Sequence, residues 1–125
     1  MLQTRGINAY RQASTTITPA RQIVMLYEGA MRFVREAKQA IMDGRIEDRF
    51  NLVCKAYKVI DALHCCIDFD QGGDIARTLD RYYTFILTRM TQINVGNDPL
   101  ICDEVVDSLR TMCRSWEQIA IGNTP

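Results

Sequence analysis

Residues 67–76 read IDFDQGGDIA, and two adjacent glycines stand here just before a long helical pattern. A glycine pair at a helix start can bind phosphate, because the exposed N–H groups and the helix dipole favour an anion. Known phosphate loops read G-x-x-x-x-G-K-[ST] or G-x-G-x-x-G, and neither pattern is present. Asp74 would repel phosphate, whereas it suits the N-cap of a helix. We therefore interpret Gly72-Gly73 as a turn between two antiparallel helices, since glycine tolerates a positive φ.

Helical patterns lie on both sides of this turn. Apolar residues keep helical spacing over 46–66 and again over 74–95. Two further helices are marked by a good N-cap residue followed by proline, Thr18-Pro19 and Asp98-Pro99. Asp43-Gly44 ends the first of these helices. Because no strand-like alternation persists, the sequence predicts an all-α fold, an antiparallel four-helix bundle.

The outer two helices each carry one apolar stripe, which predicts their buried faces. On the first helix the stripe is Ile23, Leu26, Ala30, Phe33, Ala37 and Ile41. On the last helix it is Cys102, Val105 or Val106, Leu109, Met112 or Cys113, Trp116 and Ile119.

The two middle helices carry more apolar residues than one buried arc needs. Their expected core stripes are Phe50, Val53, Tyr57, Ile60 and Ile67, and Ile75, Leu79, Tyr82, Ile86, Met90 and Ile93. A second set lies beside these stripes, and large exposed apolar patches usually mark interaction sites. We therefore predict a partner-binding groove, lined by Leu52, Ala56, Val59, Leu63, Tyr83 and Leu87. Alternatively, loops and the N-terminal segment cover this apolar surface.

The segment before Pro19 has no sustained stripe, and its β-branched residues disfavour a helix. We interpret residues 1–17 as an N-terminal arm, or short helix, and residues 18–125 as a single-domain bundle. The arm carries Ile7 and Tyr10 among polar residues, so part of it is expected to dock. Tyr10 is the predicted anchor and a further partner-binding residue, because its ring buries apolar area while its hydroxyl stays hydrogen-bonded.

Composition and charge argue against several function classes. Fifteen basic and fifteen acidic residues cancel, so we expect no attraction to nucleic acid or to an anionic membrane. No apolar run approaches the roughly 20 residues of a membrane span, and no secretory signal opens the chain. Five cysteines at irregular spacing do not form a disulfide framework. The chain is therefore expected to be cytoplasmic, with reduced thiols.

The residues that could carry chemistry do not combine into an active site. Asp61 and His64 have the spacing of a di-iron ligand pair, but the chain has one histidine and no second motif. His64, Cys65 and Cys66 point about 100° apart on a helix and cannot converge on one ion. We expect a partly buried histidine with packing cysteines, no catalytic residue, no cofactor and no metal, and hence no enzyme.

Several motifs occur in an order typical of one family. They are Asn8-Ala9-Tyr10, TPARQIVMLYEGA at 18–30, GGDIARTL at 72–79, and Asn94, Asp98-Pro99, Glu104-Val105 and Trp116. Over nearly the whole chain this set resembles the FliS family, the flagellar export chaperones that hold flagellin before secretion. The sequence departs from the family at Tyr82-Tyr83, where Leu-Tyr is usual, and at Ile67-Asp68, where Leu-Asp is usual.

The resemblance implies a helical bundle that binds the disordered C-terminal segment of flagellin. Such a protein keeps flagellin from polymerising early and helps to deliver it to the flagellar type III export apparatus. The resemblance leaves open contacts with the export gate and with the flagellar anti-sigma factor. A structural homo-oligomer, with a homodimer as its simplest form, is the alternative, because self-association would use the same apolar surface.

Overall fold

The computed structural model describes residues 17–122, which form four α-helices. In chain order these are α2 (Pro19–Met42), α3 (Ile46–Cys65), α4 (Phe69–Gly96) and α5 (Pro99–Gly122). The predicted all-α, four-helix fold is confirmed. The predicted arm lies outside the described residues except for Ile17, so the division of the chain at residue 18 stays a prediction.

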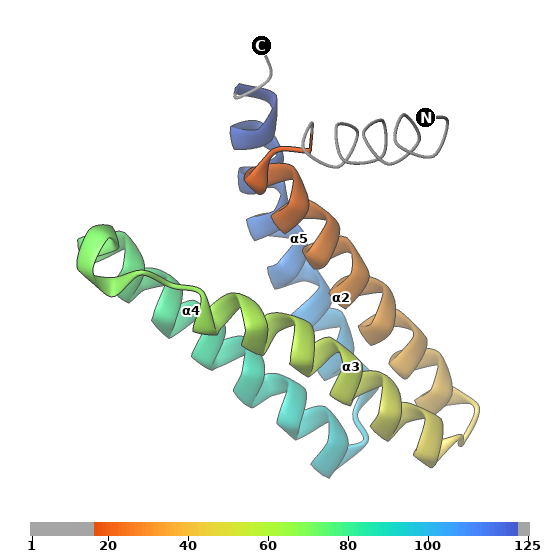
Figure 1. Cartoon of the computed structure of the whole chain (residues 1–125). Helices are drawn as coiled ribbons and strands as arrows, with labels where there is room; N and C mark the ends of the chain where they lie inside the picture. Colours follow the sequence, from red (N-terminus) through yellow and green to blue (C-terminus); the bar gives the residue numbers. More distant parts are fainter. Residues whose placement is uncertain (1–16, 123–125) are drawn as a thin grey trace, which may run out of the picture.

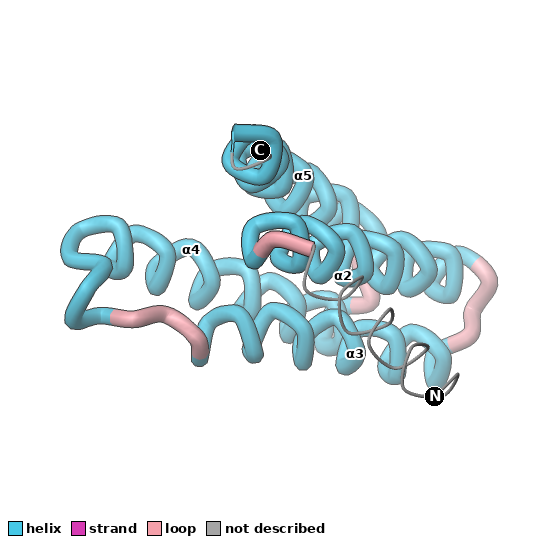
Figure 2. Tube along the Cα trace, turned by 45° about the horizontal axis from the view of Figure 1, so that its top comes forward, coloured by secondary structure: helices cyan, strands magenta, loops and turns pink. Residues whose placement is uncertain are grey.

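The helices form two antiparallel pairs, α2 with α5 and α3 with α4, and the pairs lie across each other (Figure 1). Each helix packs on its two neighbours in the ring α2–α3–α4–α5, and in the described part of the chain the backbones of the diagonal pairs do not come close together. The connections α2–α3 and α4–α5 close one end. Toward the other end, where α2 begins and α5 finishes, the pairs spread apart, as Figure 2 also shows.

The predicted helix ends follow from local capping chemistry. The Thr18 side chain accepts a hydrogen bond from the Arg21 N–H at 3.1 Å, with Pro19 in the first turn. Asp98 caps α5 in the same way, because its Oδ1 accepts from the Leu100 N–H at 2.9 Å. Gly44 ends α2 with a φ of 72°. Thr18 and Asp98 thus start α2 and α5, and Gly44 ends α2, where the sequence predicts.

The IDFDQGG segment differs from the prediction in detail. Helix α4 begins at Phe69, not Asp74, and a break at Gly73 (φ 54°, ψ −126°) separates its first turn from the rest. Asp68 is the N-cap, because its Oδ1 accepts from the Asp70 and Gln71 N–H groups at 3.1 Å each. The Asp74 side chain pairs with Arg77 instead. Gly73 therefore does have the positive φ that the turn interpretation requires, but the predicted cap was wrong by six residues.

The buried faces are rotated by about one residue from several predicted stripes. On α2, Val24, Tyr27 and Val34 are fully buried, while Leu26 is 43% exposed. On α3, the predicted core residues Phe50 and Tyr57 face outward. The other large, fully buried side chains are those of Val53, Ile60, Ile86, Met90, Ile93, Cys102, Val105 and Leu109. Steps of three and four fix the period of a stripe but not its phase, because both neighbours of a core position are often apolar.

Three more predicted stripe residues are outside the core. Ile75, at 72% exposure, lies just after the break at Gly73, so its register could not be read from the rest of α4. Ile119 on α5 is also exposed, and Ala120 is buried in its place. Trp116 is partly buried against the core.

The closed end of the bundle is held by one buried cation. Arg49 is 8% exposed, and its Nη1 donates to Asn97 Oδ1 at 2.8 Å. Asn97 itself has a left-handed φ of 53° and ends α4. The start of α3 is thereby tied to the turn between α4 and α5 by a charge-assisted hydrogen bond.

Gly73 and Gly29 have different backbone conformations, so the same substitution at each position tests the break in α4. Gly73→Ala should lower the free energy of unfolding by about 1–2 kcal/mol, because its φ is unfavourable for a residue with a Cβ. Gly29→Ala is the matched control: it lies inside α2 with open space around it and should raise stability by about 0.5–1 kcal/mol. Urea unfolding measures both, and equal effects would rule out the strained turn.

Candidate functional site

An apolar cleft of about 630 Å³ lies at the open end of the bundle. Its walls come from the start of α2, the end of α3 and the first turns of α4, and Trp116 of α5 closes one side. These are the parts where the two helix pairs spread apart in Figure 1. The cleft is therefore a consequence of how the pairs cross, and it lies between elements that are distant in sequence.

The cleft lining is mostly aliphatic and aromatic. Its apolar members are Pro19, Ile23, Leu26, Leu63, Ile67, Ile75, Ala76, Leu79, Tyr83 and Trp116. Leu26 and Ile75 expose much of their side chains, while Ala76 and Tyr83 are buried and form deeper parts of the lining. A volume of this size is within the usual range for a ligand site, and the lining favours an apolar occupant.

Two buried tyrosines meet beneath the cleft. The Tyr27 hydroxyl donates to the Tyr83 hydroxyl at 2.9 Å, and both side chains are nearly inaccessible to solvent. Burial raises the pKa of Tyr27 far above its ordinary value, and the bond with Tyr83 raises it further. Burial likewise raises the pKa of Tyr83. Both hydroxyls therefore stay protonated at neutral pH and remain hydrogen-bond donors.

The tyrosine pair is braced by aromatic and polar neighbours. The ring of Tyr82 lies 5.4 Å from that of Tyr83 in an edge-to-face arrangement, and the Tyr82 hydroxyl donates to the Ser108 carbonyl at 3.1 Å. His64 on α3 lies on the other side, with its ring 6.1 Å from that of Tyr83 and its Nε2 2.6 Å from Asp80 Oδ1. Tyr83 is thus braced by His64 of α3 and by Tyr82, which is itself bonded to α5.

The predicted groove residues divide into three groups. Leu63 and Tyr83 line the cleft. Leu52 and Val59 lie along α3, half-buried against the core, and do not line the cleft. Ala56 and Leu87 belong to the buried core itself. Tyr10 lies outside the described residues, so its role stays a prediction.

Sequence reasoning missed most of the cleft wall. Ile23, Leu26, Ile75 and Leu79 were assigned to core stripes, as was Trp116, yet all five line the cleft. The family motifs could have identified these residues, whereas the helical spacing of apolar residues could not. The segments 18–30 and 72–79, which carry the family resemblance, supply most of them.

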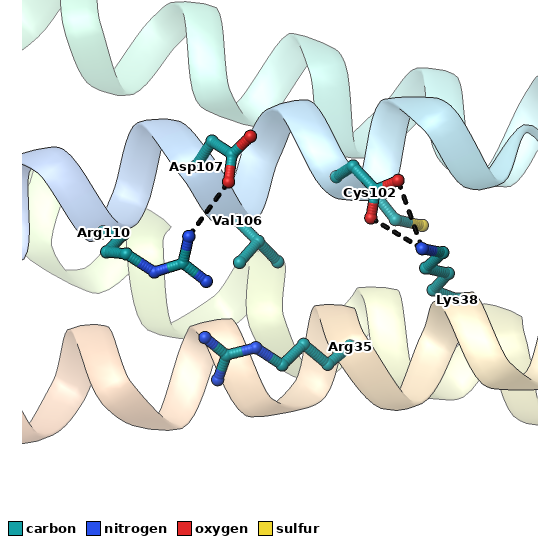
Figure 3. Close-up of a pocket in the computed structure, with 7 residues that line it drawn as sticks. Arg35, Lys38, Cys102, Val106, Asp107 and Arg110 are labelled. Carbon is teal, nitrogen blue, oxygen red and sulfur yellow. Dashed lines mark hydrogen bonds and ion pairs between the residues drawn. The ribbon is translucent and has the colours of Figure 1, made fainter.

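A second hollow, of about 180 Å³, lies between α2 and α5 and is strongly charged. Figure 3 shows the guanidinium groups of Arg35 and Arg110 pointing toward one another across it. Lys38 pairs with Asp103 at 2.9 Å, and Arg110 pairs with Asp107 at 3.1 Å. Such exposed pairs contribute little free energy. The charged walls do not suit an apolar segment, so the apolar cleft is the better candidate site.

The other chemistry-bearing residues are dispersed. Within residues 17–122 no group of three or more His, Cys, Asp or Glu side chains could hold a metal ion. His64 is partly buried as predicted, but Cys65 and Cys66 are exposed, and the expectation that they pack was wrong. No helix of the described part is long and apolar enough to cross a membrane.

Comparison with known proteins gives a consistent result. The family model described as "Flagellar protein FliS" matches residues 3–123. The flagellar secretion chaperone FliS of Vibrio cholerae is 32% identical over 119 residues, covering 91% of this chain and 88% of that protein. That of Salmonella typhimurium is 30% identical, covering 96% and 93%. A crystal structure of a bacterial flagellar chaperone superposes with a TM-score of 0.78 over 95% of this chain and 99% of that chain, at 17% identity, which supports the fold.

Because tyrosine hydroxyls are buried in this protein, we expect it to lose stability at high pH. Burial raises the pKa of Tyr82 to about 12, whereas an unfolded tyrosine ionises near 10. The stabilising contribution of Tyr82 is thus complete below pH 10 and is lost as the pH rises toward 12. Burial also raises the pKa of the Cys102 and Cys113 thiols to about 11, which adds to the loss above pH 9.

Urea unfolding at pH 8 and pH 11 measures this effect. Between these two pH values the free energy of unfolding should fall by about 1 kcal/mol less for Tyr82→Phe than for the wild-type protein. The reason is that the unfolded variant has no hydroxyl to ionise at position 82. An identical pH dependence in the two proteins would contradict the burial of this hydroxyl.

Proposed function

The chain belongs to the FliS family of flagellar proteins, and we propose that it is a cytoplasmic export chaperone for flagellin. In this proposal the apolar cleft binds the disordered C-terminal segment of flagellin. Binding prevents premature polymerisation and assists delivery to the flagellar type III export apparatus. Relatives named as flagellar secretion chaperones, at about 30% identity over most of the chain, support this role.

The observation that carries the proposal is the convergence of the resemblance motifs on one cleft. The motifs at 18–30 and 72–79 are more than forty residues apart in sequence, yet each contributes several cleft residues. Trp116, from the third motif region, joins them. If these motifs served the fold alone, their members would be expected in the core, whereas Leu26 and Ile75 are largely exposed.

The physical character of the cleft fits an unfolded apolar segment. A disordered ligand must lose conformational entropy on binding, and burial of apolar area has to offset that cost. The cleft offers such area from α2, α3, α4 and α5 together. An amphipathic helix lying in a hydrophobic groove is a recurring mode of this kind of recognition. The balanced charge of the chain means that long-range steering contributes little.

Self-association is the alternative, and a separate observation favours it. Phe50, Tyr57 and Phe85 are exposed on α3 and α4 but do not line the cleft. Exposed aromatic residues outside a ligand site are a common basis for homodimers. Contacts with the export gate and with the anti-sigma factor stay predictions under either alternative.

A pair of charge substitutions tests the cleft. Ile75→Glu should weaken binding of a flagellin C-terminal peptide by at least about tenfold, because it puts a carboxylate into the apolar lining. Val95→Glu is the control, since Val95 is 84% exposed on the same helix and lies outside the cleft. Calorimetric titration of both variants measures the difference.

Both side chains are mostly exposed, so both variants should unfold at nearly the wild-type temperature. Full binding by a folded Ile75→Glu protein would exclude the cleft as the flagellin site. If flagellin lacking its C-terminal segment bound as well as intact flagellin, the choice of ligand segment would be wrong.

The N-terminal residues supply a second test. Pro19 lines the cleft, so residues 1–17 are covalently attached near its edge, and we propose that they reach it at high effective concentration. We expect this arm to compete with flagellin, with Tyr10 as its anchor. A chain beginning at Thr18 should then bind the peptide more tightly, because the competing segment lowers the fraction of open clefts.

The truncated chain should also self-associate more strongly, since its apolar cleft lies bare. Peptide titration and analytical ultracentrifugation measure the two effects. Equal peptide affinities and equal solution masses for the full-length and truncated chains would contradict a covering role for the arm. Weaker binding by Tyr10→Ala would mean that Tyr10 contacts the flagellin peptide directly.

A further inference from the structure

The polar cluster beneath the cleft contains three hydrogen-bond donors: the hydroxyls of Tyr27 and Tyr83 and the indole N–H of Trp116. One hydrogen bond of good geometry joins the two hydroxyls. The Trp116 indole lies close enough to the Tyr27 hydroxyl to lower its pKa, but Nε1 has no hydrogen-bond partner of good geometry within residues 17–122. All three residues are held in place by the surrounding core.

The cluster has more donors than it can satisfy internally, wherever its hydrogen atoms lie. The cluster has three protons to donate and two hydroxyl oxygens to accept them. Two bonds are the most that the chain Trp116–Tyr27–Tyr83 can make, one at each link. At least one donor of the cluster therefore needs an acceptor from outside it. A buried donor without an acceptor costs on the order of 1–3 kcal/mol, so an acceptor supplied by a ligand is favoured at this point.

Two of the three donors belong to residues that line the cleft. Tyr83 and Trp116 both line the cleft, whereas Tyr27 does not. Tyr27 and Tyr83 are linked, and Tyr27 acts as the donor in that link. The Tyr83 hydroxyl proton is then left for an acceptor that enters from the cleft side. The other hydroxyl nearby, that of Tyr82, is already used, because it donates to the Ser108 carbonyl.

We propose that the cleft recognises one uncharged carbonyl oxygen of its ligand, which accepts a hydrogen bond from the Tyr83 hydroxyl. This proposal rests on the proposed function, in which the ligand is the flagellin C-terminal segment. It adds a polar requirement to a site that is otherwise apolar. The ligand has to place a main-chain carbonyl, or the carbonyl of an Asn or Gln side chain, over this point, and that fixes its register.

The surroundings favour a neutral acceptor over a carboxylate or a phosphate. An anion brought to a buried hydroxyl pair would lose its hydration, and no cation is among the cleft-lining residues. Burial raises the pKa of the neighbouring Cys113 thiol, and the acidic side chains of Glu117 and Glu28 raise it further, so negative charge is disfavoured there. A carbonyl dipole carries no such cost. An apolar helix that ends in the cleft would supply one, because its last carbonyls lack partners within the helix.

Two phenylalanine variants separate recognition from structure. Tyr83→Phe and Tyr27→Phe both remove the same internal hydrogen bond, so their effects on folding should be similar. Tyr83→Phe alone removes the hydroxyl of the cleft-lining tyrosine. In calorimetric titration with the flagellin C-terminal peptide, Tyr83→Phe should weaken binding by about three- to tenfold. Tyr27→Phe should bind as tightly as the wild-type protein, because its Tyr83 hydroxyl is free to donate.

Each outcome has a distinct meaning. Equal affinity of Tyr83→Phe and the wild-type protein would overturn the proposal, as would equal weakening by the two variants. Failure of the wild-type protein to bind the peptide would overturn the proposed function itself.

Should Tyr83→Phe fail to fold, the single tryptophan of the chain provides a second measurement on the wild-type protein. Its indole ¹⁵N–¹H resonance should move when peptide is added, since the acceptor joins the cluster of which Trp116 is part. An unchanged resonance at saturating peptide would overturn the proposal.

Discussion

The hydrogen bond between Tyr27 and Tyr83 is the contact on which the open end of the bundle depends. It joins α2 to α4 across the diagonal of the helix ring, where the backbones of these two helices do not pack together. Two long side chains can meet where two helices cannot, because a tyrosine reaches several ångströms beyond its backbone and ends in a group that bonds directionally. The two helix pairs are thus linked through the core, although they spread apart toward the open end.

The two ends of the molecule are built from different local chemistry. At the closed end, Gly44 and Asn97 adopt left-handed conformations that allow short turns, and Arg49 ties α3 to the second of them. At the open end, α4 itself contains the break at Gly73, just after its first turn. This break lets the first turn of α4 depart from the direction of the helix, and Gly72 beside it has no room for a Cβ against Ala76. The cleft wall formed by this segment therefore requires both glycines.

Stability and recognition draw on the same aromatic cluster. The buried hydroxyls belong to the core, and burial keeps them protonated over the physiological pH range. Tyr83, which carries one of them, also lines the cleft. When a binding site lies over buried polar groups, a few contacts are enough to fix the position of a ligand along the site. A ligand in any other position leaves those groups unpaired, which costs free energy. Under the proposed function, burial against the apolar walls provides most of the binding free energy, and the cluster sets the register of the ligand.

The sequence by itself determined the number of helices, nearly all of their ends and the family. Thr18-Pro19, Asp43-Gly44 and Asp98-Pro99 stop or start helices through bonds between neighbouring residues, so short-range reasoning suffices for them. The predicted site residues Leu63 and Tyr83 do line the cleft, but Ala56 and Leu87 are core residues, and Leu26 and Ile75 were assigned to the core although they are exposed. A helix with apolar residues over most of its surface has a clear period and an ambiguous phase. Which face turns inward, and where a cleft remains, was decided only by the crossing of the two helix pairs, because that crossing depends on contacts between residues far apart in the chain.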